Sequence, residues 1–356
     1  MKITSVEVTP FQMQRQDKNW RTSIYAASTV DVLGVQIHTD EGVTGVGACT
    51  VMRILGFTPE GQHSLLANTF APMLVGADPF AIEPLLRKLE SVARFTAYPL
   101  CAIDIALHDL KGKALGLPVY ELLGGAFRKE VPVIRMLGVK EPDDAVRSAM
   151  NLVEAGYRYL KLKVGPDAVK DVARVRAVRQ AVGDDVVLTV DANGAYDVKT
   201  AIRVIRQLEE LDVVVFEEPV RWDDLHDIGQ VTRAVDMPVM GDQSIRSLSD
   251  VAQAIREDAV DAVCIKLHSS GGLLNAQKAR HMCEGAGLRY HIGGTGSTWI
   301  LGAATLHLAA ASPNPEFGVE IGEAVGLDGD IVVGPTLVNG MFRVSDEPGI
   351  GVEFNA

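Results

Sequence analysis

Two lysines lie two positions apart in YLKLKVG, residues 159–165, a stretch whose composition is typical of a β-strand. Side chains alternate between the two faces of a strand, so the ammonium groups of Lys161 and Lys163 point the same way. Two like charges side by side on one face are destabilising unless something compensates them. Lysine is rarely buried unless it is paired or functional, so the apolar flanking residues favour a functional site over a solvated pair.

Three acidic residues follow in VDANG, FEEP and GDQS. From Lys163 the steps to Asp191, Glu217, Asp242 and Lys266 are 28, 26, 25 and 24 residues. Three neighbouring carboxylates in an apolar rim either take up protons or collect a cation. Oxygen ligands without His or Cys suit a hard cation, so we predict a Mg²⁺ site that Mn²⁺ could also fill. The alternative is that each acid caps a helix or pairs locally.

A cation site flanked by lysines suits the removal of a proton next to a carboxylate. This step creates an enolate, whose negative charge must be met by a metal and by cationic groups. Lys163 precedes the acids and Lys266 follows them, so we expect one lysine on each face of a substrate. Burial, Mg²⁺ and the neighbouring Lys161 would lower the pKa of Lys163 enough for it to act as a base. Only one of the adjacent Glu217 and Glu218 can point inward, and we expect Glu218 to orient a neighbour.

The elements that must position these residues are parallel strands, because their carboxyl ends meet at one edge. Apolar strands alternate with helices along the second part of the chain, which is typical of an α/β architecture. Units of this length fit a (β/α)₈ barrel, whose active site lies at the C-terminal ends of its strands. A doubly wound sheet is the alternative, but no GxGxxG or GKS/T loop follows the first strand. The eight predicted strands are VPVIRMLGV, YLKLKVG, VVLTVDANG, VVVFEEPV, PVMGDQS, AVCIKLHSS, LRYHIGG and EFGVEIGE.

The sequence divides into three predicted segments. Residues 1–125 contain three strands and then helices, which predicts an α+β unit. One of its helices, CAIDIALHDLKGKALG, carries Ile103, Ala106, Leu107 and Leu110 at helical spacing, the pattern of an amphipathic face. Residues 126–324 form the predicted barrel. We expect residues 325–356, which have strand- and turn-like character, to pack back on the N-terminal unit.

Composition excludes several classes of partner. The net charge of −12 disfavours a nucleic-acid partner, because an acidic surface repels phosphate. The longest apolar stretch, near LGAATLHLAAA, is too short to span a bilayer, and the N-terminus lacks the apolar core of a signal peptide. The four cysteines are scattered, without a CxxC pair, as in a reduced cytoplasmic protein. We expect a cytoplasmic enzyme with a small-molecule carboxylate substrate.

The motifs LKLKVG, VDANGAY, FEEPV, GDQS and IKLHSSGG, taken in order, resemble those of the enolase superfamily. They resemble in particular the muconate lactonizing enzyme (muconate cycloisomerase) subgroup of the mandelate racemase/muconate lactonizing enzyme family. The resemblance covers nearly the whole chain. It implies a modified (β/α)₈ TIM barrel with an α+β capping domain formed by the N-terminal region and the C-terminal tail, and a homo-oligomer. It also implies Mg²⁺ binding by Asp191, Glu217 and Asp242, an acid/base pair of Lys163 and Lys266, and electrostatic assistance by Lys161.

The same resemblance implies that two capping segments, residues 15–29 and 49–61, close over the site and set its specificity. Arg21 and Arg53 in these segments suggest a second anionic group on the substrate. Glu320 in the eighth strand resembles cycloisomerases more than the Asp-x-Asp of dipeptide epimerases, and His291 we interpret as structural. The predicted substrate contacts are Trp20, Arg21, Tyr25, Met52, Arg53, His268, Gly294, Thr295 and Glu320.

Several outcomes use the same six charged residues. We expect a cycloisomerase, or a racemase or epimerase of an amino-acid derivative, with dehydration of a hydroxy acid as the alternative. One rival is a metal-independent, aldolase-like barrel in which Lys266 forms a Schiff base. A second is a phosphate-binding enzyme that uses the backbone N–H groups of GGTGST, which we expect to hold a carboxylate. A third is a non-catalytic binding protein that does not bind Mg²⁺.

Overall fold

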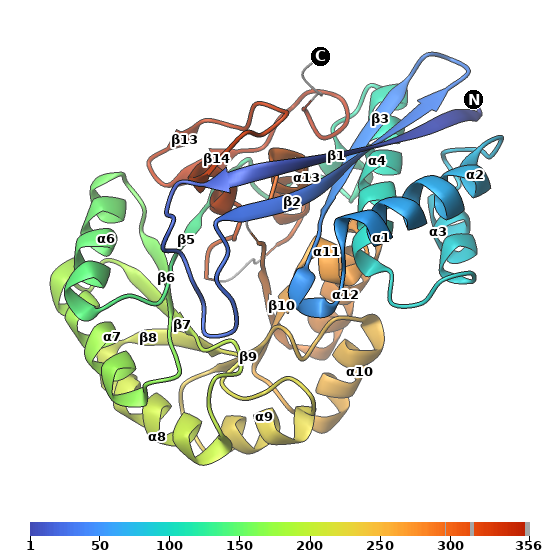
Figure 1. Ribbon diagram of the computed structural model, residues 1–356. Coiled ribbons are helices and arrows are strands. Elements are labelled where there is room, and N and C mark those ends of the chain that lie inside the picture. Colours follow the sequence, from blue (N-terminus) through green and yellow to red (C-terminus); the bar gives the residue numbers. More distant parts are fainter. Residues whose placement is uncertain (296, 314–316, 353–356) are drawn as a thin grey trace.

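The centre of the molecule is a curled parallel sheet whose strands pair in chain order. The structure, a computed structural model, describes residues 1–295, 297–313 and 317–352. Helices cover the outside of the sheet (Figure 1). The strands are β5 (Ile134–Leu137), β6 (Tyr159–Lys163), β7 (Val187–Asp191), β8 (Val213–Glu217), β9 (Val239–Gly241), β10 (Ala262–Ile265) and β11 (Arg289–Ile292). The helices are α6 (Pro142–Glu154), α7 (Ala168–Val182), α8 (Val198–Leu208), α9 (Leu225–Thr232), α10 (Leu248–Glu257), α11 (Leu267–Ser270), α12 (Leu273–Ala286) and α13 (Trp299–Ala310).

The barrel closes through a segment that is not a regular strand. Val319 makes parallel bridges to both Val133 and Ile292, and so joins the first and last strands. The predicted eighth strand EFGVEIGE is therefore wrong as a continuous strand, and its Glu316 lies outside the described residues. Gly318 has a left-handed φ of 82°, and a 3₁₀-helix, Gly322–Gly326, follows almost at once, so little extended chain remains for a ladder. The barrel architecture itself is confirmed.

An antiparallel sheet from the N-terminal region packs against one side of the barrel (Figure 1). Its strands are β1 (Ile3–Arg15), β2 (Thr29–Thr39) and β3 (Thr44–Thr50), and β2 and β3 pair as an antiparallel hairpin. The helices beside it are α1 (Pro59–Ser64), α2 (Ala71–Leu74), α3 (Ile82–Glu90), α4 (Ala97–Leu115) and α5 (Val119–Leu122), with short 3₁₀ or π turns at Arg53–Leu55 and Leu65–Phe70. A further 3₁₀ turn, Glu209–Leu211, lies in the barrel between α8 and β8.

Helix α4 differs from its prediction. It is buried on nearly all sides rather than on one face, and even Asp104, His108 and Asp109 are buried. The reason is its position, because α4 contacts β2 and β3 of the N-terminal sheet and also α11 and α12 of the barrel. The sequence shows which apolar residues share a face, but it does not show that a second layer covers the other face.

The C-terminal tail packs back as predicted. Its strand β12 (Leu327–Asp328) pairs with β1, and Val119 donates a backbone hydrogen bond to Gly349. The tail also reaches the start of the barrel, because β13 (Leu337–Val338) and β14 (Met341–Arg343) form a sheet with β4 (Glu130–Pro132). The division at residues 125 and 324 stays a prediction. Within the described residues, no helix has the length and apolar character needed to cross a bilayer.

Asp109 ties the N-terminal sheet to this tail. Its carboxylate accepts hydrogen bonds from the backbone N–H groups of Val46 and Ile350, each at 2.8 Å, and pairs with Lys113 at 2.9 Å. Asp109→Ala should lower the free energy of unfolding by about 3–5 kcal/mol, because it leaves buried donors and a lysine unpaired. Thermal or denaturant unfolding measures the loss. The exposed Asp346→Ala, which removes the Lys129 pair, should cost about 1 kcal/mol or less, and equal losses would contradict the role of Asp109.

Candidate active site

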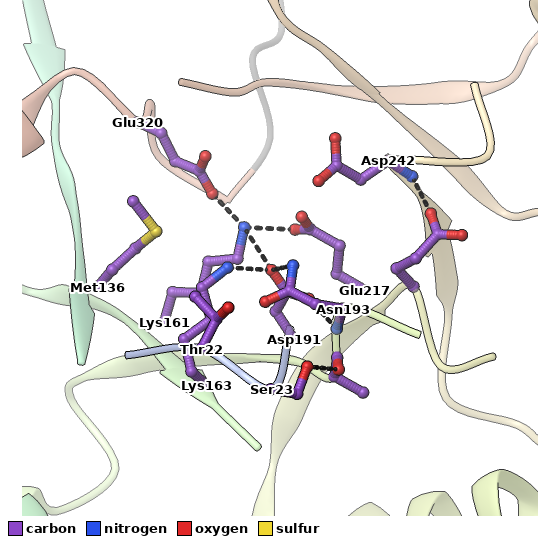
Figure 2. A network of polar contacts seen from close by, with 12 residues as sticks. Thr22, Ser23, Met136, Lys161, Lys163, Asp191, Asn193, Glu217, Asp242 and Glu320 are labelled. Carbon is purple, nitrogen blue, oxygen red and sulfur yellow. Dashed lines mark hydrogen bonds and ion pairs between the residues drawn. The ribbon is translucent and has the colours of Figure 1, made fainter. Parts of the chain in front are cut away.

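The six charged residues predicted from the sequence meet at the C-terminal end of the barrel, and Figure 2 shows all of them except Lys266, which pairs with Asp242. Lys161 and Lys163 end β6, Asp191 is the last residue of β7, and Glu217 is the last residue of β8. The register of the parallel sheet places Lys163 beside Asp191 and Asp191 beside Glu217. Asp242 directly follows β9, and Lys266 directly follows β10. All six are buried: Lys161, Lys163, Asp191, Glu217, Asp242 and Lys266.

Lys161 lies among the acids rather than beside a free lysine. Its ammonium group contacts Glu217 at 2.6 Å and Asp191 at 3.5 Å, and it donates a short hydrogen bond to Glu320. Figure 2 shows these carboxylates converging on the Lys161 nitrogen from three elements. The two lysines of β6 therefore do point to the same side, and carboxylates compensate their repulsion.

Each remaining lysine pairs with one of the predicted metal ligands. Lys163 donates a short hydrogen bond to Asp191, and Lys266 donates one to Asp242 at 2.5 Å. Both lysines line the same pocket. They come from β6 and from the end of β10, on either side of the three acids in the order of the sheet.

The pKa values follow from burial and pairing. Burial alone would lower the pKa of Lys266 and of Lys161, but Asp242 beside the first and Glu217 beside the second hold both values well above the ordinary range. Burial would raise the pKa of Asp191, yet Lys163 and Lys161 lower it to about 2. At Lys161 and Lys266 the adjacent carboxylates therefore have a larger effect on the pKa than burial has.

Glu217 is the acid whose charge is least compensated. Burial and then the charge of Asp191 raise its pKa well above the ordinary value, although Lys161 opposes the shift. Its Oε1 atom is buried without a hydrogen-bond partner among the described residues. Oxygens of Glu217 and Asp242 lie within 4.8 Å of one another, together with the sulfur of Cys264. A buried carboxylate oxygen without a donor, in a set of oxygen ligands, fits a hard divalent cation.

Two residues with left-handed backbones hold the ligand side chains in place. Glu218 has a φ of 40°, which turns its side chain away from that of Glu217, and its carboxylate accepts backbone hydrogen bonds from Asp242 at 2.6 Å and Ser244 at 3.2 Å. Glu218 thus orients a neighbour, as predicted, and burial raises its pKa to about 8. Asn193, with a φ of 44°, donates its backbone N–H to Asp191 at 2.7 Å. Asn193 was not predicted as a site residue, although it lies two residues after Asp191.

A pocket with about 820 Å³ of empty space, part of it open to solvent, lies over this cluster. Seven of the nine predicted substrate contacts line it: Trp20, Tyr25, Met52, His268, Gly294, Thr295 and Glu320. Arg21 and Arg53 do not. The Arg21 guanidinium donates to the Val139 carbonyl, and Arg53 pairs with Asp31 at 2.7 Å with its side chain 64% exposed. The two arginines therefore give no support to the predicted second anion contact.

Other lining residues were not predicted. Trp222 and Arg246 come from loops after β8 and β9, and each follows a predicted acid by four or five residues. Such residues could have been sought in each loop that follows a strand. Met136 in β5 and Tyr98 in α4 have no comparable signal, because apolar residues in a strand and a buried helix look like core. The remaining unpredicted lining residues are Thr22, Ile24, Ile54, Leu55, Asn193, Gln243 and Ser269.

The loop between β1 and β2 is fastened directly to the strand ends. Ser23 donates a hydrogen bond of 2.7 Å to the carbonyl of Ala192, next to Asp191 (Figure 2). Arg21 accepts a backbone hydrogen bond from Val139 after β5. Figure 1 shows this loop, in dark blue, extending from the ends of β1 and β2 toward the barrel strands near β7. The first predicted capping segment thus covers the pocket, and Met52, Ile54 and Leu55 of the second segment also line it.

The described residues of the GGTGST stretch have a structural role. Gly296, within this stretch, lies outside the described residues. The Gly294 N–H donates to the Glu320 carboxylate at 2.9 Å. A Cβ at Gly294 would lie 1.9 Å from the Glu320 carbonyl oxygen, so only glycine allows this approach. His291 is buried, with its Nε2 3.4 Å from Glu320, which fits a structural role. Burial, and then Lys266, lowers the pKa of His268 to about 3, so its ring stays neutral beside Tyr98.

Two family models cover most of the chain. Residues 5–124 match the model described as "Mandelate racemase / muconate lactonizing enzyme, N-terminal domain", and residues 144–356 match "Enolase C-terminal domain-like". The chain belongs to this family of the enolase superfamily. Its relatives place it in the predicted muconate lactonizing enzyme subgroup, which consists of enzymes that abstract a proton next to a carboxylate.

Three relatives illustrate the range of activities. The chain is 30% identical to the N-succinyl-L-Arg/Lys racemase of Bacillus cereus, over 100% of this chain and 96% of the relative, and its solved structure superposes with a TM-score of 0.95. The dipeptide epimerase of Enterococcus faecalis, solved with Mg and L-Leu-L-Tyr, is 31% identical over 99% of both chains, with a TM-score of 0.94. Muconate cycloisomerase 1 of Rhodococcus opacus is 31% identical over 100% of this chain and 96% of the relative. All three are isomerases, as the sequence predicted for this chain.

Glu218→Ala should weaken Mg²⁺ binding by about 10- to 100-fold, because the loop that carries Asp242 loses its acceptor. Titration calorimetry with Mg²⁺ measures the change. Glu209→Ala is the matched control, since Glu209 also accepts two backbone N–H groups, from Asp236 at 3.0 Å and Met237 at 3.3 Å, but outside the pocket. Equal Mg²⁺ affinity in Glu218→Ala and the wild type would show that Glu218 does not position the cation site.

Proposed function

We propose that this protein is a Mg²⁺-dependent racemase or epimerase that removes the proton next to the carboxylate of an amino-acid derivative, through an enolate intermediate. The observation that carries the proposal is the placement of Lys163 and Lys266. They line one pocket from β6 and from the end of β10, with the three acids between them in the order of the sheet. Removing a proton from one face and returning it on the other requires a group on each face.

Asp191, Glu217 and Asp242 would hold the Mg²⁺. The fit is supported by the buried Oε1 of Glu217, which has no partner among the described residues, and by the all-oxygen ligand set. A bound divalent cation would supply positive charge where the enolate develops negative charge. In the E. faecalis relative, Mg is present together with the dipeptide.

The lysines would move the proton. Lys163 and Lys266 would each take or return it at the carbon next to the carboxylate, and Lys161 would stay charged beneath them. The three ion pairs of Lys161 support its electrostatic role, because a lysine held by Glu217, Asp191 and Glu320 keeps its proton. Trp20, Tyr25 and Trp222 would help to exclude water from the pocket.

The same geometry bears on the rivals. An imine needs a neutral lysine, whereas Lys266 is paired with Asp242 at 2.5 Å. Phosphate binding through GGTGST is disfavoured, since the Gly294 N–H donates to a carboxylate of the protein. Dehydration and cycloisomerisation pass through the same enolate, so the product distinguishes them. Glu320 lines the pocket, which is compatible with cycloisomerisation. We keep cycloisomerisation as the second candidate because the chain is similar to muconate cycloisomerase.

Further parts of the proposal concern the state of the protein. We infer a cytoplasmic location, which is supported by four free, buried cysteines. We also infer a homo-oligomer and the ability of Mn²⁺ to replace Mg²⁺; size-exclusion chromatography with light scattering, and titration with Mn²⁺, test these two points.

Exchange of the α-proton in D₂O tests the function directly. With Mg²⁺ present, N-acyl amino acids, dipeptides, proline derivatives and muconates are followed by proton NMR. We expect exchange with at least one amino-acid derivative, together with inversion of its configuration. Lys163→Ala and Lys266→Ala should each slow the exchange by about 10²- to 10⁴-fold, because a positioned acid or base is lost.

Lys170→Ala serves as the control, since Lys170 is 54% exposed and pairs with Glu141 on the surface. It should leave exchange unchanged. A keto-acid product or a lactone would move the assignment to dehydration or cycloisomerisation. Exchange without a divalent cation, or full activity in both lysine variants, would refute the proposed mechanism.

A further inference from the structure

Arg246 is the one charged side chain of the pocket lining for which the described residues provide no counter-charge. Lys163 and Lys266 pair with acids of the cluster, and the two lining acids, Asp242 and Glu320, belong to the same network. The Nη2 atom of Arg246 is buried and has no hydrogen-bond partner among the described residues. The guanidinium carbon of Arg246 lies over the ring of Trp222, 6.0 Å from its centroid.

The backbone fixes where this side chain starts. Arg246 lies in the loop between β9 and α10, four residues after Asp242. Its N–H donates to the carboxylate of Asp250 at 2.9 Å, and Ser247 caps α10 directly after it. The carboxylate of Asp250 therefore holds the loop and does not pair with the guanidinium. The anchored loop presents Arg246 to the pocket beside Trp222.

The other residues of the pocket lining indicate what kind of ligand the Arg246 guanidinium would bind. Around the pocket, most residues contributed by the capping segments are apolar or aromatic: Trp20, Ile24, Tyr25, Met52, Ile54 and Leu55. A carboxylate that enters such surroundings loses its hydration and needs a paired cation. A guanidinium offers two parallel N–H donors that match a carboxylate, and stacking on an aromatic ring helps to orient it.

We propose that Arg246 binds a second carboxylate of the substrate, remote from the reacting carbon, and thereby selects dianionic amino-acid derivatives. The inference rests on the proposed function. It replaces Arg21 and Arg53 as the source of the second anion contact, since neither lines the pocket. It also separates the relatives by chemistry, because an N-succinyl amino acid and muconate carry a second carboxylate, whereas a hydrophobic dipeptide does not.

Substrate pairs that differ only in this carboxylate test the proposal. One pair is N-succinyl-L-alanine and its terminal amide, and the other is L-Ala-L-Glu and L-Ala-L-Gln. Exchange of the α-proton in D₂O gives kcat and KM for each compound. Binding is measured separately by quenching of tryptophan fluorescence, since Trp20 and Trp222 line the pocket. Binding does not require turnover, so it tests Arg246 even for a compound that does not react.

The expected result is a preference of the wild-type protein for the acid of at least one pair. Arg246→Met should weaken binding of that acid by about 10- to 100-fold, the worth of a charged hydrogen bond, while binding of the amide changes less than about threefold. For a compound that turns over, the loss should appear in KM more than in kcat. Arg246→Lys should recover part of the affinity, because the charge remains but the paired donors do not.

Arg221→Met is the matched control, because Arg221 precedes Trp222 but is 79% exposed and pairs with Asp223. It should leave the acid preference intact. If the wild type binds acid and amide equally in both pairs, or if Arg246→Met keeps the acid preference, the proposal is overturned and Arg246 only stacks on Trp222. Absence of exchange together with an Arg246-dependent acid preference would refute the proposed function alone. Exchange without such a preference would refute this inference alone.

Discussion

The balance of buried charge at the ends of the barrel strands is the constraint on which the rest of the structure depends. Three ammonium groups, those of Lys161, Lys163 and Lys266, are shared among four buried carboxylates. Buried charges are tolerated only when they are paired, so each strand end must deliver its side chain to the right partner. The set lacks one positive charge, and the buried Oε1 of Glu217 without a partner shows where the deficit falls.

The convergence of the charged residues could be predicted from the sequence. Parallel strands in a barrel end at the same rim, so charged residues at similar intervals after apolar strands must converge. Lys163, Asp191 and Glu217 even lie in register across three neighbouring strands. The role of Glu218 was also predictable, because adjacent residues in a strand cannot share a face. Loops are different, since Arg21 and Arg53 have the right chemistry but engage Val139 and Asp31 instead of the pocket.

What the sequence did not predict depends on contacts between distant segments. Helix α4 looked amphipathic because its second neighbour, the barrel wall at α11 and α12, is more than 150 residues away along the chain. The barrel closes through two β-bridges of Val319, and no alternation of apolar and polar residues in the sequence predicts them. In the sequence Arg246 looks like a surface arginine. Only the structure shows that its loop is anchored by Asp250 and that its guanidinium lies beside Trp222. The charged residues of the site therefore lie at the predictable ends of the strands, whereas much of the remaining pocket lining comes from loops.

The most direct test of the account is the position of a divalent cation. Crystals of the protein grown with Mn²⁺, measured at the manganese absorption edge, would locate the ion by its anomalous scattering. We predict one peak, bound by Asp191, Glu217 and Asp242. A peak instead among Cys264, His291 and Glu320, which could also hold a metal, would contradict it, as would the absence of any peak at millimolar Mn²⁺.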